Sequence, residues 1–147
     1  MALVLIVDDQ PAIRELLTTW ISRDGYQTAQ AADAEAALDK MMARPADVVF
    51  CDVQIPEQGE FRLAARLHER FPDTAIILAT GGDCNEPPVI SFQPGVVVYL
   101  AMPFGCEAVL KAVRVGLRFH QMSLAVRAKK DDRADSIETL LATPPED

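Results

Sequence analysis

The chain has few of the features that mark secreted, membrane-bound or nucleic-acid-binding proteins. Its only cysteines, Cys51, Cys84 and Cys106, are widely spaced and form no Cys-x-x-Cys pair, so we expect neither a disulfide framework nor a zinc site. No apolar stretch has the length of a membrane span, and residues 1–7 lack a basic leader and fit a strand better than a signal peptide. Basic residues are also in the minority, 14 against 22 acidic ones, for a net charge of -8. We therefore expect a cytoplasmic protein whose partners are proteins, with no direct contact to nucleic acid or membrane.

What the chain does have is enough apolar content for one core. It has 147 residues, of which 50% are hydrophobic, a size and composition typical of a single domain. Predicted strands cover residues 3–7, 26–29, 47–52, 75–79 and 96–100. Predicted helices begin at Pro11, after Asp33, near Glu60 and near Gly105. This alternation indicates an α/β fold with a doubly wound, five-stranded parallel sheet.

Two segments depart from the regular alternation. Between residues 83 and 94, three prolines leave room for only about one or two helical turns, so the fourth helix is predicted to be short or irregular. The last amphipathic segment predicts a long C-terminal helix that continues past His120. We divide the chain into a domain of residues 1–122 and a segment of residues 123–147, which comprises a helix extension and an acidic tail expected to be disordered. The alternative for the tail is a brief helix from Asp135 to Leu141.

Three aspartates end two of the predicted strands. Asp8 and Asp9 follow the first aliphatic run, and Asp52 ends the run that begins at Val48. Because parallel strands bring their carboxyl ends to one edge of the sheet, the three acids are expected to form one pocket for a divalent cation. The alternative is that Asp9 merely caps the helix that starts at Pro11 and that Asp52 starts a turn.

Four motifs at the ends of predicted strands then point to a family. They are Val7-Asp8-Asp9-Gln10-Pro11, Asp52-Val53-Gln54-Ile55-Pro56, Ala79-Thr80-Gly81 and Tyr99-Leu100-Ala101-Met102-Pro103-Phe104. In these motifs the chain resembles the receiver domain of two-component response regulators, a flavodoxin-like fold, over about residues 2–122. The order of the motifs is that of the family, and their spacing is nearly so.

The resemblance implies a role for each matching residue. Asp52 corresponds to the phosphoacceptor, Thr80 to the hydroxyl that binds the phosphoryl group, and Tyr99 to the aromatic residue whose rotamer reports phosphorylation. The implied ligands of Mg²⁺ are Asp8, Asp9, Asp52 and the backbone carbonyl of Gln54. The implied donor is a phosphohistidine on a histidine kinase or a histidine phosphotransfer protein. His68 and His120 are expected to be ordinary surface or boundary residues.

The chain departs from the family most sharply at Met102, where the family has a lysine. A thioether cannot pair with Asp52 or with a phosphoryl oxygen as an ammonium does. We predict that Mg²⁺ binding survives, because carboxylates supply it, while coupling from the phosphoryl group to the fifth strand weakens. The alternative is that Arg14 or another nearby basic residue supplies the missing positive charge.

These features lead to a stand-alone response regulator that signals through protein contacts to an unknown downstream protein. It would catalyse at most its own phosphorylation and dephosphorylation. The first alternative is a pseudo-receiver, which binds its partner whether or not it is phosphorylated. The second is a phosphohydrolase of the haloacid-dehalogenase type, disfavoured because Gln54 stands where that class needs a second acid. A homodimer through the C-terminal helix is also considered.

Overall fold

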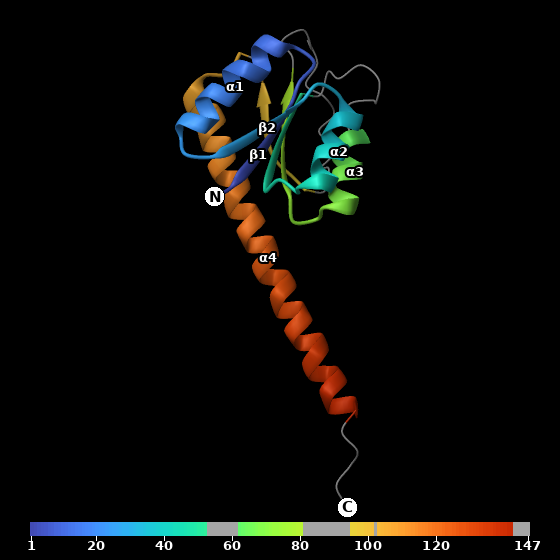
Figure 1. The fold of residues 1–147 in the computed structure, drawn as a ribbon. Coiled ribbons are helices and arrows are strands. Elements are labelled where there is room, and N and C mark those ends of the chain that lie inside the picture. Colours follow the sequence, from blue (N-terminus) through green and yellow to red (C-terminus); the bar gives the residue numbers. More distant parts are fainter. Residues whose placement is uncertain (53–61, 81–94, 102, 143–147) are drawn as a thin grey trace, which may run out of the picture.

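A five-stranded parallel sheet lies between two layers of helices (Figure 1). The computed structural model describes residues 1–52, 62–80, 95–101 and 103–142. The strands are β1 (Leu3–Val7), β2 (Gln27–Ala31), β3 (Val48–Asp52), β4 (Ala75–Thr80) and β5 (Val96–Ala101), arranged in the order β2-β1-β3-β4-β5. The described helices are α1 (Pro11–Arg23), α2 (Ala34–Ala43), α3 (Arg62–Arg70) and α4 (Cys106–Ala142). The predicted flavodoxin-like sheet is confirmed, while the predicted fourth helix at residues 83–94 lies outside the described residues.

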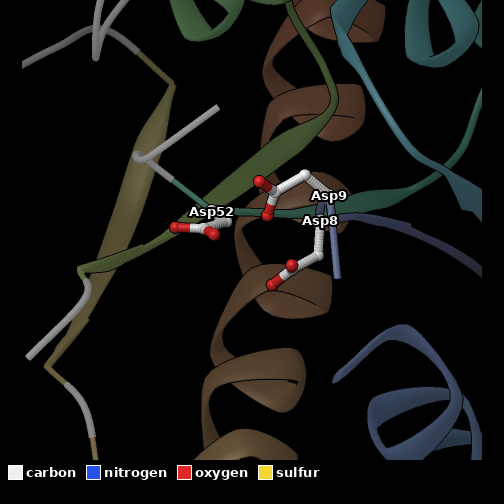
Figure 2. A group of neighbouring side chains, drawn as sticks. All are labelled: Asp8, Asp9 and Asp52. Carbon is white, nitrogen blue, oxygen red and sulfur yellow. The ribbon is translucent and has the colours of Figure 1, made fainter. Parts of the chain in front are cut away.

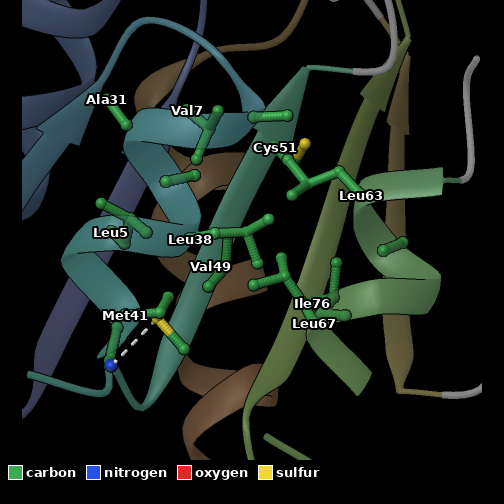
Figure 3. Close-up of a cluster of buried hydrophobic side chains, with 14 of the residues drawn as sticks. Leu5, Val7, Ala31, Leu38, Met41, Val49, Cys51, Leu63, Leu67 and Ile76 are labelled. Atoms are coloured by element: carbon green, nitrogen blue, oxygen red, sulfur yellow. Dashed lines mark hydrogen bonds between the residues drawn. The ribbon is translucent and has the colours of Figure 1, made fainter. Parts of the chain in front are cut away.

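The sheet is buried on both faces, as its aliphatic strands predict. Every residue of β1 is buried, because alternate side chains enter opposite layers. Leu3, Leu5 and Val7 join the cluster under α2 and α3 (Figure 3). Val4 and Ile6 join the second cluster, under α1 and α4. Two separate cores therefore hold the sheet rigid and fix where its carboxyl edge lies.

The N-termini of α2 and α1 show which aspartate caps a helix and which does not. Asp33 caps α2, since its Oδ1 accepts a hydrogen bond from the backbone N–H of Ala36 at 2.8 Å. At α1 the N-cap residue is Gln10, and the helix has no side-chain cap. The interpretation of Asp9 as a helix cap is therefore wrong. Pro11 starts α1 by its fixed φ and missing N–H, without help from a carboxylate.

The C-terminal helix is longer than the sequence predicted. α4 is one continuous helix of 37 residues that projects well beyond the body of the domain (Figure 1). The expectation of a disordered tail is wrong for residues 129–142, and the brief helix predicted within them is part of α4. Its sequence has neither proline nor glycine from Leu117 to Thr143 and is rich in good helix formers. No helix in the described ranges has the length and apolarity to cross a membrane.

A polar network fixes α4 to the amino-terminal edge of the sheet. Asp73, in the turn before β4, accepts a hydrogen bond from Ser123 Oγ at 2.7 Å and pairs with Arg127 Nε at 3.1 Å. His120 contacts two acidic residues, with Nδ1 2.6 Å from the Asp73 carbonyl oxygen and Nε2 3.1 Å from Asp47 Oδ1. The last of these anchors is Arg127, so the rest of α4 extends beyond the contacts made by Asp73.

Removing the Asp73 carboxylate should therefore loosen α4. We expect Asp73→Ala to lower the free energy of unfolding by about 1–3 kcal/mol, because Ser123 and Arg127 both lose a partly buried acceptor. The matched control is Asp24→Ala, whose partner Arg114 is 3.6 Å away and 60% exposed. That change should cost less than about 1 kcal/mol. Urea unfolding of both variants makes the comparison, and equal losses would contradict the anchoring role of Asp73.

Candidate functional site

Three carboxylates meet at the carboxyl edge of the sheet. β1 and β3 are neighbours, with Val7 opposite Cys51, so the residues that follow and end these strands lie side by side. One carboxylate oxygen each from Asp8, Asp9 and Asp52 can be chosen so that all three lie within 4.8 Å of one another (Figure 2). The cluster predicted from the sequence is thus present in the fold.

Burial makes this cluster electrostatically costly. Asp8 is only 7% exposed, whereas Asp9 is exposed and Asp52 half-buried. The pKa of Asp8 rises from 3.8 to about 6, first because burial disfavours its charged form, and further because Asp52 and Asp9 are negatively charged neighbours. The N–H of Gln10 donates to Asp8 Oδ1 at 2.8 Å and opposes this rise. A cation at the cluster would relieve the same repulsion.

Arg14 does not supply that cation to the carboxyl groups. Its Nη1 donates to the backbone carbonyl oxygen of Asp8 at 2.6 Å, so the guanidinium holds the turn between β1 and α1. In the described part of the chain, no basic side chain forms an ion pair with Asp8 or Asp9. This contact and the Gln10 N–H bond were not predicted from the sequence, since a main-chain partner leaves no pattern of residue types.

The thiol of Cys51, next to the cluster, is a poor metal ligand, so the available ligands are oxygen atoms. Cys51 precedes Asp52 and is buried, which raises its pKa to about 12, with the nearby carboxylates adding to the effect. The thiol therefore stays protonated at neutral pH and is a poor metal ligand. Carboxylate oxygens are the ligands that Mg²⁺ takes in proteins, so the residues present fit a magnesium ion.

The other predicted site residues are placed only in part. Thr80 ends β4 and its backbone pairs with Ala101 of β5, which puts it on the strand next to Asp52. Tyr99 of β5 is half-buried and packs against the cluster under α2 and α3. The Thr80 side chain, Gln54 and Met102 lie outside the described residues, so their roles stay predictions.

Comparison with known proteins agrees with the fold. The model of the response regulator receiver domain matches residues 4–114. The chain is 34% identical to the positive alginate biosynthesis regulatory protein of Pseudomonas aeruginosa, over 86% of this chain and 51% of that protein. It is 31% identical to response regulator MprA of Mycobacterium avium, over 91% of this chain and 55% of that protein. The chain spans about half the length of these curated relatives.

Solved structures show the same architecture. The signal receiver domain of an HD domain-containing protein from Pseudomonas fluorescens superposes with a TM-score of 0.73 at 28% identity, over 82% of this chain and 98% of that one. A CheY-like receiver domain protein from Methanospirillum hungatei gives a TM-score of 0.76 at 24% identity, over 84% and 98%. The match to the receiver model, over most of the chain, makes it a signalling module. The chain belongs to the response regulator receiver domain family.

The raised pKa of Asp8 predicts how stability depends on pH without metal. The folded state holds a proton on Asp8 that the unfolded state releases between pH 3.8 and about 6, so the stability of the metal-free protein falls as pH rises through that range. We expect Asp8→Asn to raise the free energy of unfolding by about 1–2 kcal/mol at pH 7 and by little at pH 4. Denaturant unfolding in a chelator measures both values.

The control is Asp39→Asn, on the exposed face of α2, which should change stability little at either pH. A gain for Asp8→Asn that is equal at pH 4 and pH 7, or a loss at pH 7, would show that Asp8 does not carry the repulsion.

Proposed function

We propose that this chain is a cytoplasmic response regulator that accepts a phosphoryl group on Asp52. The donor is a phosphohistidine on a histidine kinase or a histidine phosphotransfer protein. The magnesium ligands are Asp8, Asp9, Asp52 and the backbone carbonyl of Gln54. The observation that carries the proposal is the group of three carboxylates within 4.8 Å, at the ends of two adjacent strands in a member of the receiver family.

The chemistry needs little more than position and charge. A carboxylate oxygen of Asp52 forms a bond to phosphorus while the bond from phosphorus to the histidine nitrogen breaks, and the electron pair of that bond returns to the imidazole, which takes up a proton. Bound Mg²⁺ reduces the repulsion between the carboxylate and the phosphoryl oxygens. Asp8 and Asp9 provide carboxylate ligands for the cation beside Asp52. The Thr80 hydroxyl donates a hydrogen bond to a phosphoryl oxygen. The chain catalyses no reaction beyond its own phosphorylation and dephosphorylation.

The output of the signal is proposed to be a protein contact. The curated relatives include a regulator of alginate biosynthesis and extend to about twice the length matched here, so their outputs belong to regions that this chain does not match. The downstream partner is a protein of unknown identity, and neither nucleic acid nor a membrane is contacted directly. A homodimer through α4 stays a prediction.

A second candidate is a pseudo-receiver that binds its partner independently of phosphate. The observation in its favour is Met102, because the family lysine at this place would pair with Asp52 and then with the phosphoryl group. In this alternative the acidic cluster still binds Mg²⁺, while phosphorylation at Asp52 is absent or has no effect on β5.

Incubation with Mg²⁺ and acetyl phosphate tests whether Asp52 accepts a phosphoryl group, which the first candidate requires. We expect the intact mass of the wild-type protein to increase by one phosphoryl group, and we expect no increase for Asp52→Asn, which lacks the nucleophilic oxygen. Asp33→Asn, at the cap of α2, is the control and should be modified like the wild type. A wild-type protein that gains no mass, or an Asp52→Asn variant that gains as much, would sink the proposed phosphorylation.

Restoring the lysine tests the cause of weak coupling. In the wild type we expect phosphorylation to shift the backbone amide resonances of Tyr99 and Leu100 only slightly. Met102→Lys should enlarge these shifts, because an ammonium joins the phosphoryl group to the end of β5. Met42→Lys, at an exposed site on α2, should leave them as in the wild type. Shifts in the wild type as large as those in Met102→Lys would show that Met102 does not weaken coupling.

A further inference from the structure

One face of α4 carries an apolar stripe that runs from its anchored part into its projecting part and that nothing in the described structure covers. Six large apolar side chains of the helix are exposed, and one of them, Leu124 (45% exposed), falls on the opposite face. The other five are Val115, Met122, Val126, Ile137 and Leu141, with exposed fractions of 42%, 62%, 53%, 55% and 81%. At 100° per residue these positions fall on one face of the helix. The stripe is about 39 Å long at 1.5 Å per residue, and much of it lies beyond the body of the domain (Figure 1).

The stripe is also hollowed where its anchored part meets its projecting part. A groove of about 510 Å³ is lined by Phe119, Met122, Val126 and Lys130, together with polar neighbours on the same helix. Phe119 is half-buried against the core on one side. The groove therefore joins the anchored part of α4 to its projecting part, and its floor is held in place by the domain.

Basic residues interrupt the stripe at its centre. Lys130 and Arg133 fall on the same helix face as the apolar residues, and Lys129 lies at its border. All three are exposed, and within the described residues none of them forms an ion pair. Asp131 also lines the groove, next to Arg127 and Lys130, whereas Asp132 falls on another face of the helix. The stripe is thus apolar towards both ends and positively charged between them.

This charge pattern favours one kind of binding partner for the stripe over others. In a second copy of the chain paired in register, Lys130 and Arg133 would face themselves. Antiparallel pairing that overlaps the two apolar ends would set Lys130 against Val126 and Lys129 against Arg127 of the other copy, which leaves the central charges against apolar or like-charged side chains. An anionic membrane is opposed by the net charge of -8 and by the acids bordering the basic block. A helix with carboxylates at its centre fits both the apolar and the basic parts.

We propose that this stripe binds an amphipathic helix of another protein, with apolar residues at heptad spacing and acidic residues in the middle. The two helices pack as a short coiled coil, in which apolar side chains enter the groove and carboxylates pair with Lys130 and Arg133. Burial of the apolar ends supplies most of the affinity, and the central charges set the choice of partner. The interaction stands apart from phosphoryl transfer at Asp52.

Two synthetic helical peptides test the charge selection. Both have leucine at the heptad positions, and they differ only in a central pair of Glu or Lys residues. By fluorescence anisotropy with the full chain, we expect the Glu peptide to bind at least about tenfold more tightly, equivalent to about 1.4 kcal/mol. The double variant Lys130→Glu/Arg133→Glu should reverse the preference. The control Arg23→Glu/Lys40→Glu makes the same charge change on α1 and α2 and should leave the preference unchanged.

The apolar part is tested with Met122→Gln/Val126→Gln, which should weaken binding of the Glu peptide while far-ultraviolet circular dichroism still reports the intact helix. Equal binding of the two peptides, or binding of neither, would overturn the proposal. So would a dimer in sedimentation velocity, or sedimentation with phosphatidylserine vesicles, if Met122→Gln/Val126→Gln abolished it. Each of these results leaves the acetyl phosphate reaction at Asp52 unaffected, so the two proposals fail separately.

Discussion

The repulsion among three carboxylates at one edge of a parallel sheet is the constraint on which the functional account depends. Parallel pairing of β1 with β3 forces Asp8, Asp9 and Asp52 together, and burial of Asp8 makes their mutual charge more costly than it would be in water. A divalent cation would relieve that cost and would then attract a phosphoryl group. The proposed binding of metal and acceptance of phosphate thus rest on one electrostatic imbalance, which the fold maintains and which Arg14, held on the main chain, does not remove.

The rest of the structure holds the three carboxylates together at the carboxyl edge of the sheet. At the opposite edge it anchors α4. Two hydrophobic layers clamp the sheet, so that the strand ends cannot separate to relieve the repulsion. At the opposite edge, Asp47 and Asp73 attach α4 to the body through His120, Ser123 and Arg127. The projecting part of α4 therefore leaves the domain from a fixed base. The acidic site and the proposed docking stripe belong to one rigid unit, although they are chemically independent.

The sequence predicted what depends on local pattern. Continuous aliphatic runs identified β1 and β3, helical spacing identified α1, and the strand ends led to the acidic cluster. The length of α4 was missed, because residues 129–142 have a charged composition typical of disorder and only their lack of proline and glycine indicates a helix. The Asp73 network was missed as well, since it joins residues about 50 positions apart and long-range polar contacts have no periodicity. The roles of Gln54, Thr80, Tyr99 and Met102 rest on family resemblance alone.

The most direct measurement of the central claim is calorimetric titration of the protein with Mg²⁺ at pH 6, in two buffers of different ionisation enthalpy. Because burial and the neighbouring carboxylates raise the pKa of Asp8 to about 6, a fraction of the molecules hold a proton there before metal arrives. The account predicts one Mg²⁺ per chain, release of a fraction of a proton on binding, and loss of that release in Asp8→Asn. An absence of binding, or binding with no proton release from the wild type, would contradict it.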